Sequence, residues 1–134
     1  MPGDYLVVYD STMARFWFFN EKAREAIHDR LQNLPCGQIM PDEELYRLGV
    51  MFSDRRFGEL IFVLHPGWLL SQSDFNGKGW MPNGMHGYHP EDPWSDAVFL
   101  SNSEPPIPVR TIADVYPCMQ SAAGFTKSLK TRSL

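Results

Sequence analysis

The sequence predicts an α/β fold, in the form of a layered sheet with flanking helices. Three observations lead to this prediction. Residues 59–64 contain a strand-like segment whose residues 60–64 are all apolar, without polar alternation, which is typical of a strand covered on both faces. Two further runs rich in β-branched and aromatic residues lie upstream, at residues 5–9 and 14–19. Apolar residues also recur at helical spacing over residues 20–34 and 112–119.

The first half of the chain alternates between strand-like and helix-like segments. A short polar turn at residues 11–13 separates the first two strand-like runs, so we expect them to pair as an antiparallel hairpin. Asn20 is a good N-cap for the helix that follows, and Pro35 stops that helix. A second, shorter helix is expected to begin at Pro41, because the fixed φ of proline suits the first helical position, and to end at Gly49.

The second half is dominated by a long loop at residues 71–95, rich in Gly, Pro, Asn and Ser. Because it carries several large apolar side chains, we expect this loop to be packed against the domain. Residues 96–100 predict a further short strand, and Thr111 is expected to cap a final helix. We therefore expect a single α/β domain over residues 1–125, followed by a flexible basic tail at residues 126–134.

The composition excludes several classes of protein. With 134 residues, 43% of them hydrophobic and 21% charged, the chain is expected to be globular. The net charge of -4 argues against nucleic acid as the main partner. No apolar run approaches the about 18 residues of a membrane span, and the start lacks the pattern of a signal peptide. We expect a cytoplasmic protein without a membrane partner, in which Cys36 and Cys118 are reduced.

The leading candidate site is the loop at residues 83–93. It places His86 and His89 among glycines, with Glu91 and Asp92 just after them. Neutral histidine is a frequent metal ligand, and glycine lets the backbone approach an ion closely. We therefore predict one part of a divalent-metal site, with His86 as the ligand. The alternative is that these histidines only hydrogen-bond to the loop backbone while the neighbouring side chains pack.

Further candidates for substrate binding are His65, Tyr88 and His89. His65 directly follows the apolar run at residues 59–64, and sites often form just past the C-terminal ends of strands in open α/β sheets. The motifs of the α/β-hydrolase elbow, of dinucleotide-binding and phosphate-binding loops, and of HExxH metalloproteases are missing from the sequence. A cysteine–histidine nucleophile remains open, although nothing in the surrounding sequence supports one.

Four segments occur along the chain in a distinctive order. They are residues 62–68 (Phe-Val-Leu-His-Pro-Gly-Trp), 84–88 (Gly-Met-His-Gly-Tyr), 96–100 (Asp-Ala-Val-Phe-Leu) and 111–117 (Thr-Ile-Ala-Asp-Val-Tyr-Pro). Together they resemble the C-terminal part of the type I phosphodiesterase / nucleotide pyrophosphatase group, which belongs to the alkaline phosphatase superfamily. The resemblance covers residues 55–119 and rests on the order of the segments more than on any one of them.

The resemblance implies a doubly wound α/β sheet that carries two divalent ions, usually zinc. In this group a Thr or Ser nucleophile attacks the phosphorus of a phosphodiester or nucleotide-like small molecule. The histidine of the Gly-x-His-Gly loop is a metal ligand in the group, which assigns that role to His86. His89 stands where many members carry Asp, so the resemblance gives it no role.

The chain departs from the pattern of the group in its first half. The Asp-His-Gly segment, which supplies two metal ligands, is missing, and the nearest imitation of the nucleophile segment is residues 10–12 (Asp-Ser-Thr). We therefore expect the C-terminal portion of such an enzyme, inactive or nearly so alone. It would contribute one metal ligand and part of the substrate wall, and whether it is itself an enzyme stays open.

Two other functions stay open on the sequence. One is a non-enzymatic α/β interaction module whose contact surface is the aromatic loop at residues 75–94, since Trp and Tyr are typical anchors of interfaces. The exposed sheet edges of a partial fold would also favour self-association. The other is a self-contained small hydrolase that uses His86, His89 and Asp92.

Overall fold

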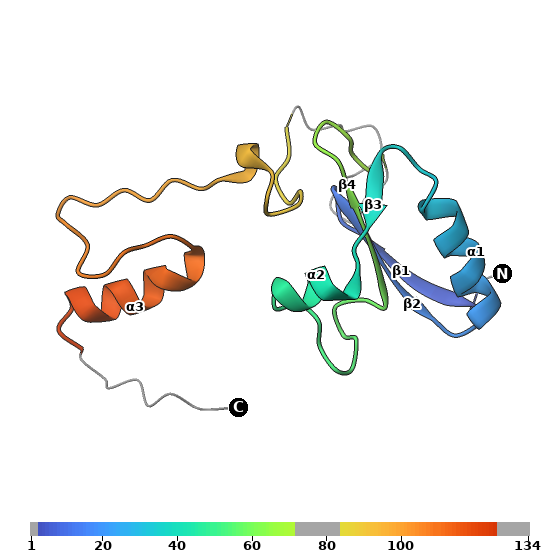
Figure 1. The fold of residues 1–134 in the computed structure, drawn as a ribbon, viewed down its shortest axis with the longest axis horizontal. Helices are drawn as coiled ribbons and strands as arrows, with labels where there is room; N and C mark the ends of the chain where they lie inside the picture. Colours follow the sequence, from blue (N-terminus) through green and yellow to red (C-terminus); the bar gives the residue numbers. More distant parts are fainter. Residues whose placement is uncertain (1–2, 72–83, 126–134) are drawn as a thin grey trace. The chain divides into compact units, whose positions relative to one another are not determined.

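A computed structural model describes residues 3–71 and 84–125 of the chain (Figure 1). The chain divides into two units, residues 1–96 and residues 97–134. The expectation of a single domain over residues 1–125 stays a prediction, and the tail at residues 126–134 lies outside the described residues.

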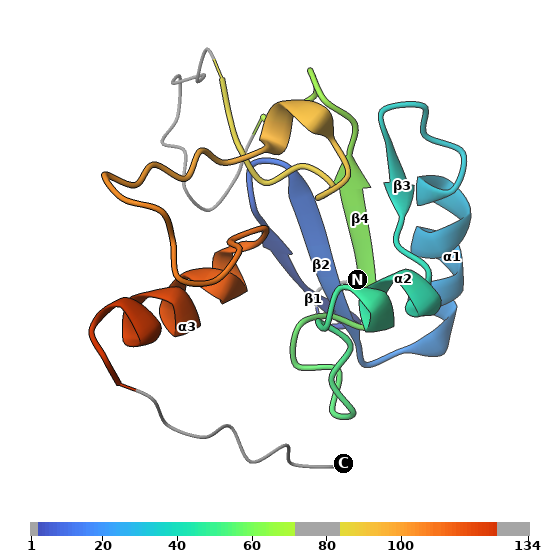
Figure 2. The ribbon, with the colours of Figure 1, turned by 60° about the vertical axis from the view of Figure 1, so that its left-hand side comes forward.

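The first unit is built on a four-stranded sheet of order β1-β2-β4-β3 (Figures 1 and 2). Its strands are Tyr5–Tyr9 (β1), Met13–Phe18 (β2), Gly37–Ile39 (β3) and Leu60–Leu64 (β4). β1 and β2 form the predicted antiparallel hairpin, with Val7 opposite Phe16. β4 pairs with β2 on one side and with β3 on the other, so β1 and β3 are the edge strands of this sheet.

Every pairing in this sheet is antiparallel, whereas a doubly wound sheet consists mainly of parallel strands. The α/β class is confirmed, but the described strands do not show the doubly wound arrangement. The hairpin turn between β1 and β2 is too short for the crossover that parallel neighbours require. β3 was not predicted, because its three residues carry no strand pattern and depend on β4 for their hydrogen bonds.

The prediction of a strand at residues 96–100 is wrong. These residues form no strand, and the side chains of Val98 and Leu100 are 81% and 87% exposed. A β-prone run becomes a strand only when a neighbouring strand supplies the hydrogen bonds of the ladder. Among the described residues, no strand pairs with this segment.

The helices of the first unit begin within one residue of their predicted starts. The side chain of Asn20 accepts a hydrogen bond from the N–H of Lys22 (2.9 Å) at the start of α1 (Glu21–Leu31). α2 (Asp42–Arg47) begins one residue later than predicted, so Pro41 is its N-cap and not its first residue. Gly49 follows the end of α2 with a φ of +71°, a left-handed conformation that favours glycine.

The core lies on both faces of β4, all of whose residues are buried. Neighbouring strand residues point to opposite faces, so Leu60 faces one side while Ile61 and Val63 face the other. The first side packs with Ala14, Phe16 and residues of α1, and the second with Met40, Leu45 and the segment after α2. The prediction that this strand is covered on both faces is confirmed.

The second unit contains α3 (Ile112–Ala122). Asp114 accepts hydrogen bonds from the backbone N–H groups of Arg110 (3.0 Å) and Thr111 (2.8 Å), and these lower the pKa of its carboxyl group. Pro117 lies inside the helix without ending it. Cys118 is buried, and it and Cys36 are free thiols, as expected.

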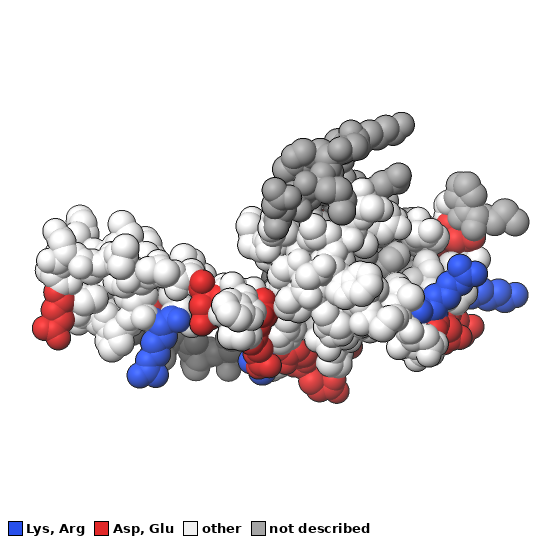
Figure 3. Space-filling view, turned by 90° about the horizontal axis from the view of Figure 1, so that it is seen from above, with Lys and Arg blue, Asp and Glu red and all other residues white. Residues whose placement is uncertain are grey.

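Charge is dispersed on the face that Figure 3 shows, where the Lys and Arg side chains do not merge into one area. The expectation that nucleic acid is not a partner stays a prediction. No helix in the described part of the chain is long and apolar enough to cross a membrane. The cytoplasmic location stays a prediction as well.

Candidate functional site: the loop at residues 84–92

The loop at residues 84–92 contacts the end of the sheet where the β1–β2 turn lies next to the end of β4 (Figure 2). The N–H of Leu64 donates to the carbonyl oxygen of Thr12 (2.9 Å), and the N–H of Leu70 donates to that of Ser11 (2.9 Å). Ser11 and Thr12 are polar, yet they are only 5% and 2% exposed. The turn is therefore a buried support, hydrogen-bonded to β4 and to Leu70, against which the loop packs.

Thr12 connects this turn to the loop. Its hydroxyl donates a hydrogen bond to the carbonyl oxygen of Gly87 (2.8 Å) and lies 3.5 Å from that of His86. A buried hydroxyl is costly unless it is hydrogen-bonded, and the loop supplies the acceptor. Thr12 is therefore not presented as a nucleophile, although residues 10–12 imitate the nucleophile segment of the phosphodiesterases. Asp10 is bound to Arg15 (3.0 Å).

Gly87 has the geometry that its place in the loop demands. Its φ is +95°, and a Cβ at this position would lie 2.9 Å from the hydroxyl oxygen of Thr12. Both the backbone conformation and the close approach therefore require glycine. Gly84 differs, because a Cβ there would meet nothing within 4 Å.

The ring of His86 is exposed and has no partner among the described residues. The residue is exposed, while its neighbour Gly87 is held by Thr12. Within residues 3–71 and 84–125, the ring of His86 makes no hydrogen bond or ion pair. A histidine on a held backbone with an open ring suits a ligand that arrives from elsewhere.

His89 is in the opposite situation, because both of its ring nitrogens are engaged. Nδ1 accepts a hydrogen bond from the N–H of Glu91 (3.2 Å), and Nε2 lies 3.0 Å from Oε1 of Glu44 on α2. This network assigns the ring hydrogen to Nε2, which donates to the carboxylate. His89 thus follows the alternative foreseen for the loop, in which histidine is structural.

Glu44 and Arg47 complete this second contact, which was not predicted from the sequence. Nε of Arg47 donates to Oε2 of Glu44 (2.7 Å), and Nη2 donates to Glu91 (2.8 Å). The bond from Arg47 is the main cause of a lowered pKa of the Glu44 carboxyl group, and His89 adds to it. An acid in the first turn of a helix is expected for its dipole alone, so its long-range role was missed.

The remaining candidates lie nearby without converging on His86. The hydroxyl of Tyr88 donates to the carbonyl oxygen of Trp68 (3.1 Å), and the N–H of Trp68 donates to that of His65 (3.1 Å). His65 itself is exposed. Asp92 caps a short 3-10 helix, Pro93–Ser95 (η1), and bonds to Ser95 (3.0 Å). The carboxylate of Asp92 and the ring of His89 therefore both already make hydrogen bonds within the protein.

The described residues do not fit a zinc site by themselves. Such sites need three or four protein ligands, and no three His, Cys, Asp or Glu side chains converge within residues 3–71 and 84–125. His86 is a single candidate ligand. Phe75, Trp80 and Met81, which were expected to pack the loop down, lie outside the described residues.

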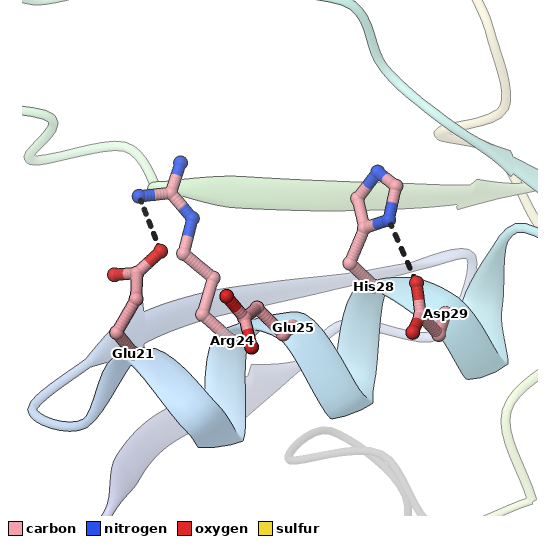
Figure 4. Close-up of a pocket in the computed structure, with 5 residues that line it drawn as sticks. All are labelled: Glu21, Arg24, Glu25, His28 and Asp29. Atoms are coloured by element: carbon pink, nitrogen blue, oxygen red, sulfur yellow. Dashed lines mark ion pairs between the residues drawn. The ribbon is translucent and has the colours of Figure 1, made fainter.

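A hollow lies along α1 (Figure 4). All of the residues that line it belong to this one helix. Nη1 of Arg24 lies 4.0 Å from Oε1 of Glu21, and Nδ1 of His28 lies 3.8 Å from Oδ1 of Asp29. Exposed pairs of this kind are ordinary on a helix surface. The lining residues are Glu21, Arg24, Glu25, His28 and Asp29.

Comparison of the chain with protein-family models, with curated proteins and with solved structures finds no match.

Proposed function

We propose that this chain is the C-terminal portion of a metal-dependent phosphodiesterase or nucleotide pyrophosphatase-like hydrolase, with a fold related to that of alkaline phosphatases. His86 contributes one ligand to a divalent ion, with zinc as the expected metal. The loop and the neighbouring segment at residues 65–68 form part of the wall around a phosphodiester or nucleotide-like small molecule. The chain alone is inactive or nearly so.

One observation carries this proposal. The Gly-Met-His-Gly-Tyr segment that resembles the phosphodiesterases is also the place where the ring of His86 is exposed and makes no hydrogen bond within the described residues. Its neighbour Gly87 has a φ of +95°, so the glycine of the motif is required by the backbone. The resemblance in sequence and the local geometry therefore select the same residue.

The proposal assigns no catalytic step to this chain. Thr12 is buried and hydrogen-bonded, and the candidate ligand His86 stands alone among the described residues. Any further ligands and the nucleophile would have to come from residues outside those described. His65 and Tyr88 stay candidates for substrate contacts, because both belong to the segments joined through Trp68.

Calorimetric titration of the chain with zinc tests the proposal. We expect weak binding that falls at least tenfold in His86→Ala. His28→Ala is the matched control, because His28 is likewise an exposed histidine of the first unit but lies on α1. Its zinc affinity should equal that of the unaltered chain. Equal affinities for all three proteins would overturn the assignment of His86.

A second candidate function is an interaction module, and one observation favours it. Trp94, at the end of the aromatic loop at residues 75–94, is 90% exposed in η1. Exposed tryptophan is a frequent anchor of protein interfaces. Residues 75–83 of this surface lie outside those described. Self-association through the edge strands β1 and β3 belongs to the same proposal.

Sedimentation velocity over a range of concentrations tests this second candidate. We expect the chain to associate, and Trp94→Ala to shift it toward the monomer. Trp68→Ala is the control, because Trp68 is also exposed, at 54%, but lies outside the aromatic loop. A monomer at every concentration, before any substitution, would contradict the proposal.

A further inference from the structure

We infer that Thr12 is a positioning residue for the candidate site, because its buried hydroxyl anchors the backbone of the loop next to His86. The inference deepens the proposed function, since it concerns how the same histidine is presented. It rests on contacts within the first unit that need no metal. It would therefore stand even if His86 received a different ligand.

The anchor itself is buried and hydrogen-bonded to the sheet. Thr12 is 2% exposed, and its carbonyl oxygen accepts the N–H of Leu64 on β4 (2.9 Å). The next residue, Met13, begins β2 and pairs with Val63. Threonine is β-branched, so its χ1 is also restricted compared with serine. The position of the hydroxyl is thus set by the two central strands of the sheet.

The bond from this anchor acts one residue away from His86. It ends on the carbonyl oxygen of Gly87 (2.8 Å), and the carbonyl oxygen of His86 is 3.5 Å from the same hydroxyl. Holding this stretch of backbone fixes where the Cα of His86 lies, while the ring stays exposed. Such support by a neighbouring group is what a precise ligand position requires.

The other end of the loop has an independent anchor. His89 and Glu91 are held by Glu44 and Arg47 on α2. The backbone of the loop is therefore held at the β1–β2 turn, and its second half is held at α2, while the Tyr88 hydroxyl adds a bond to the carbonyl oxygen of Trp68 (3.1 Å). The Tyr88 bond is made by the end of a long side chain, so loss of the Thr12 bond should release the backbone of residues 84–88, and the contacts of residues 89–92 should persist.

Backbone ¹⁵N relaxation on the full chain, without metal, tests this inference. Rigid backbone has an order parameter near 0.85 and flexible backbone has one below about 0.6. We expect His86 and Gly87 to be in the rigid range, and to fall into the flexible range in Thr12→Val, which keeps the shape but loses the donor. Thr12→Ser, which keeps the donor, should stay close to the unaltered chain, and residues 89–92 should be unchanged throughout.

A second pair of variants approaches the same contact from the loop. Gly87→Ala should mobilise residues 84–88, because its Cβ would meet the Thr12 hydroxyl at 2.9 Å. Gly84→Ala is the matched control and should change nothing, since its Cβ meets no atom within 4 Å. If Thr12→Val disturbs the whole sheet, this pair decides the question. The inference is overturned if the order parameters of residues 86 and 87 are unchanged in Gly87→Ala or in a folded Thr12→Val.

Zinc calorimetry of the same variants separates the two proposals. If Thr12→Val mobilises the loop but His86→Ala leaves the zinc affinity unchanged, the anchor is upheld and the proposed function is refuted. If His86→Ala lowers the zinc affinity but Thr12→Val leaves the loop order parameters unchanged, the proposed function is upheld and the anchor is refuted.

Discussion

The two halves of the loop at residues 84–92 hold their histidines in opposite ways. In residues 84–88 the backbone is held, through the bond from Thr12 to Gly87, and the ring of His86 makes no hydrogen bond to the residues that the structure describes. In residues 89–92 the side chains are held, because both ring nitrogens of His89 are hydrogen-bonded. Two histidines three positions apart in one glycine-rich loop thus have different roles.

The difference teaches how to recognise a candidate ligand. A histidine whose ring makes two hydrogen bonds within the protein is already satisfied, so a metal would have to displace the bond at the ring nitrogen that it binds. A histidine with an open ring and a supported backbone gives up nothing of this kind. The number of partners at the ring, and not the spacing in the sequence, distinguishes His86 from His89.

The largest effect is expected where the first half of the loop is held. Gly87→Ala should lower the free energy of unfolding by about 1–3 kcal/mol, the usual cost of a strained backbone position. The cause is the φ of +95° together with the close approach to Thr12. Denaturant unfolding followed by far-UV circular dichroism measures it. Gly84→Ala should change the free energy by less than about 0.5 kcal/mol, and equal effects of both would refute the comparison.

The second half of the loop should respond to the loss of its histidine. His89→Ala should lower the free energy of unfolding by about 1 kcal/mol, the net worth of a typical hydrogen bond that is lost. The side chain is 18% exposed and contacts Glu44 at 3.0 Å. The same denaturant measurement applies. His89→Ala in a Glu44→Gln background should cost less, because the shared contact is already weakened.

The pH dependence of stability should show the contact of Glu44. Its pKa is lowered in the folded protein, first by Arg47 and then by His89. The stabilisation is therefore fully present above the ordinary pKa of glutamate and is lost as the pH falls through the lowered value. We expect Glu44→Gln to remove this part of the acid dependence in thermal melts. The carboxyl groups of Asp42, Asp54 and Asp114 also have lowered pKa values, so the acid dependence that they cause should persist in Glu44→Gln.

The smallest effect on stability is expected for His86→Ala. Its exposed ring makes no hydrogen bond within the described residues, so the free energy of unfolding should change by less than about 0.5 kcal/mol. A stability loss as large as that of His89→Ala would show that the ring of His86 is structural. In that case the distinction between the two halves of the loop would fail.

The fold was predictable where the signal is local. The hairpin of β1 and β2, the N-cap at Asn20 and the two-sided burial of β4 all follow from neighbouring residues. The antiparallel pairings of β4 and the presence of β3 depend on which segments meet in space, and so they were missed. The run at residues 96–100 shows the converse, because strand propensity alone did not produce a strand.

The candidate site divides in the same way. His86 and Gly87 were found from the sequence, because glycines around a histidine are a local pattern. Their partners were not, since Thr12 lies 75 positions from Gly87 and Glu44 lies 45 positions from His89. Nothing in residues 10–12 or in the acidic start of α2 indicates which loop they contact.

The long separation between Thr12 and Gly87 has a consequence for folding. Thr12 is held in place by its bond from Leu64, so we expect the acceptor to reach its donor after β2 and β4 have paired. The loop that then remains to be closed runs from Leu64 to Gly87, and closing it has an entropic cost. We therefore expect the setting of His86 to depend on the pairing of β4 with β2. A chain that has lost the pairing of β4 presents this histidine on an unanchored segment, so the candidate site assembles only on a finished sheet.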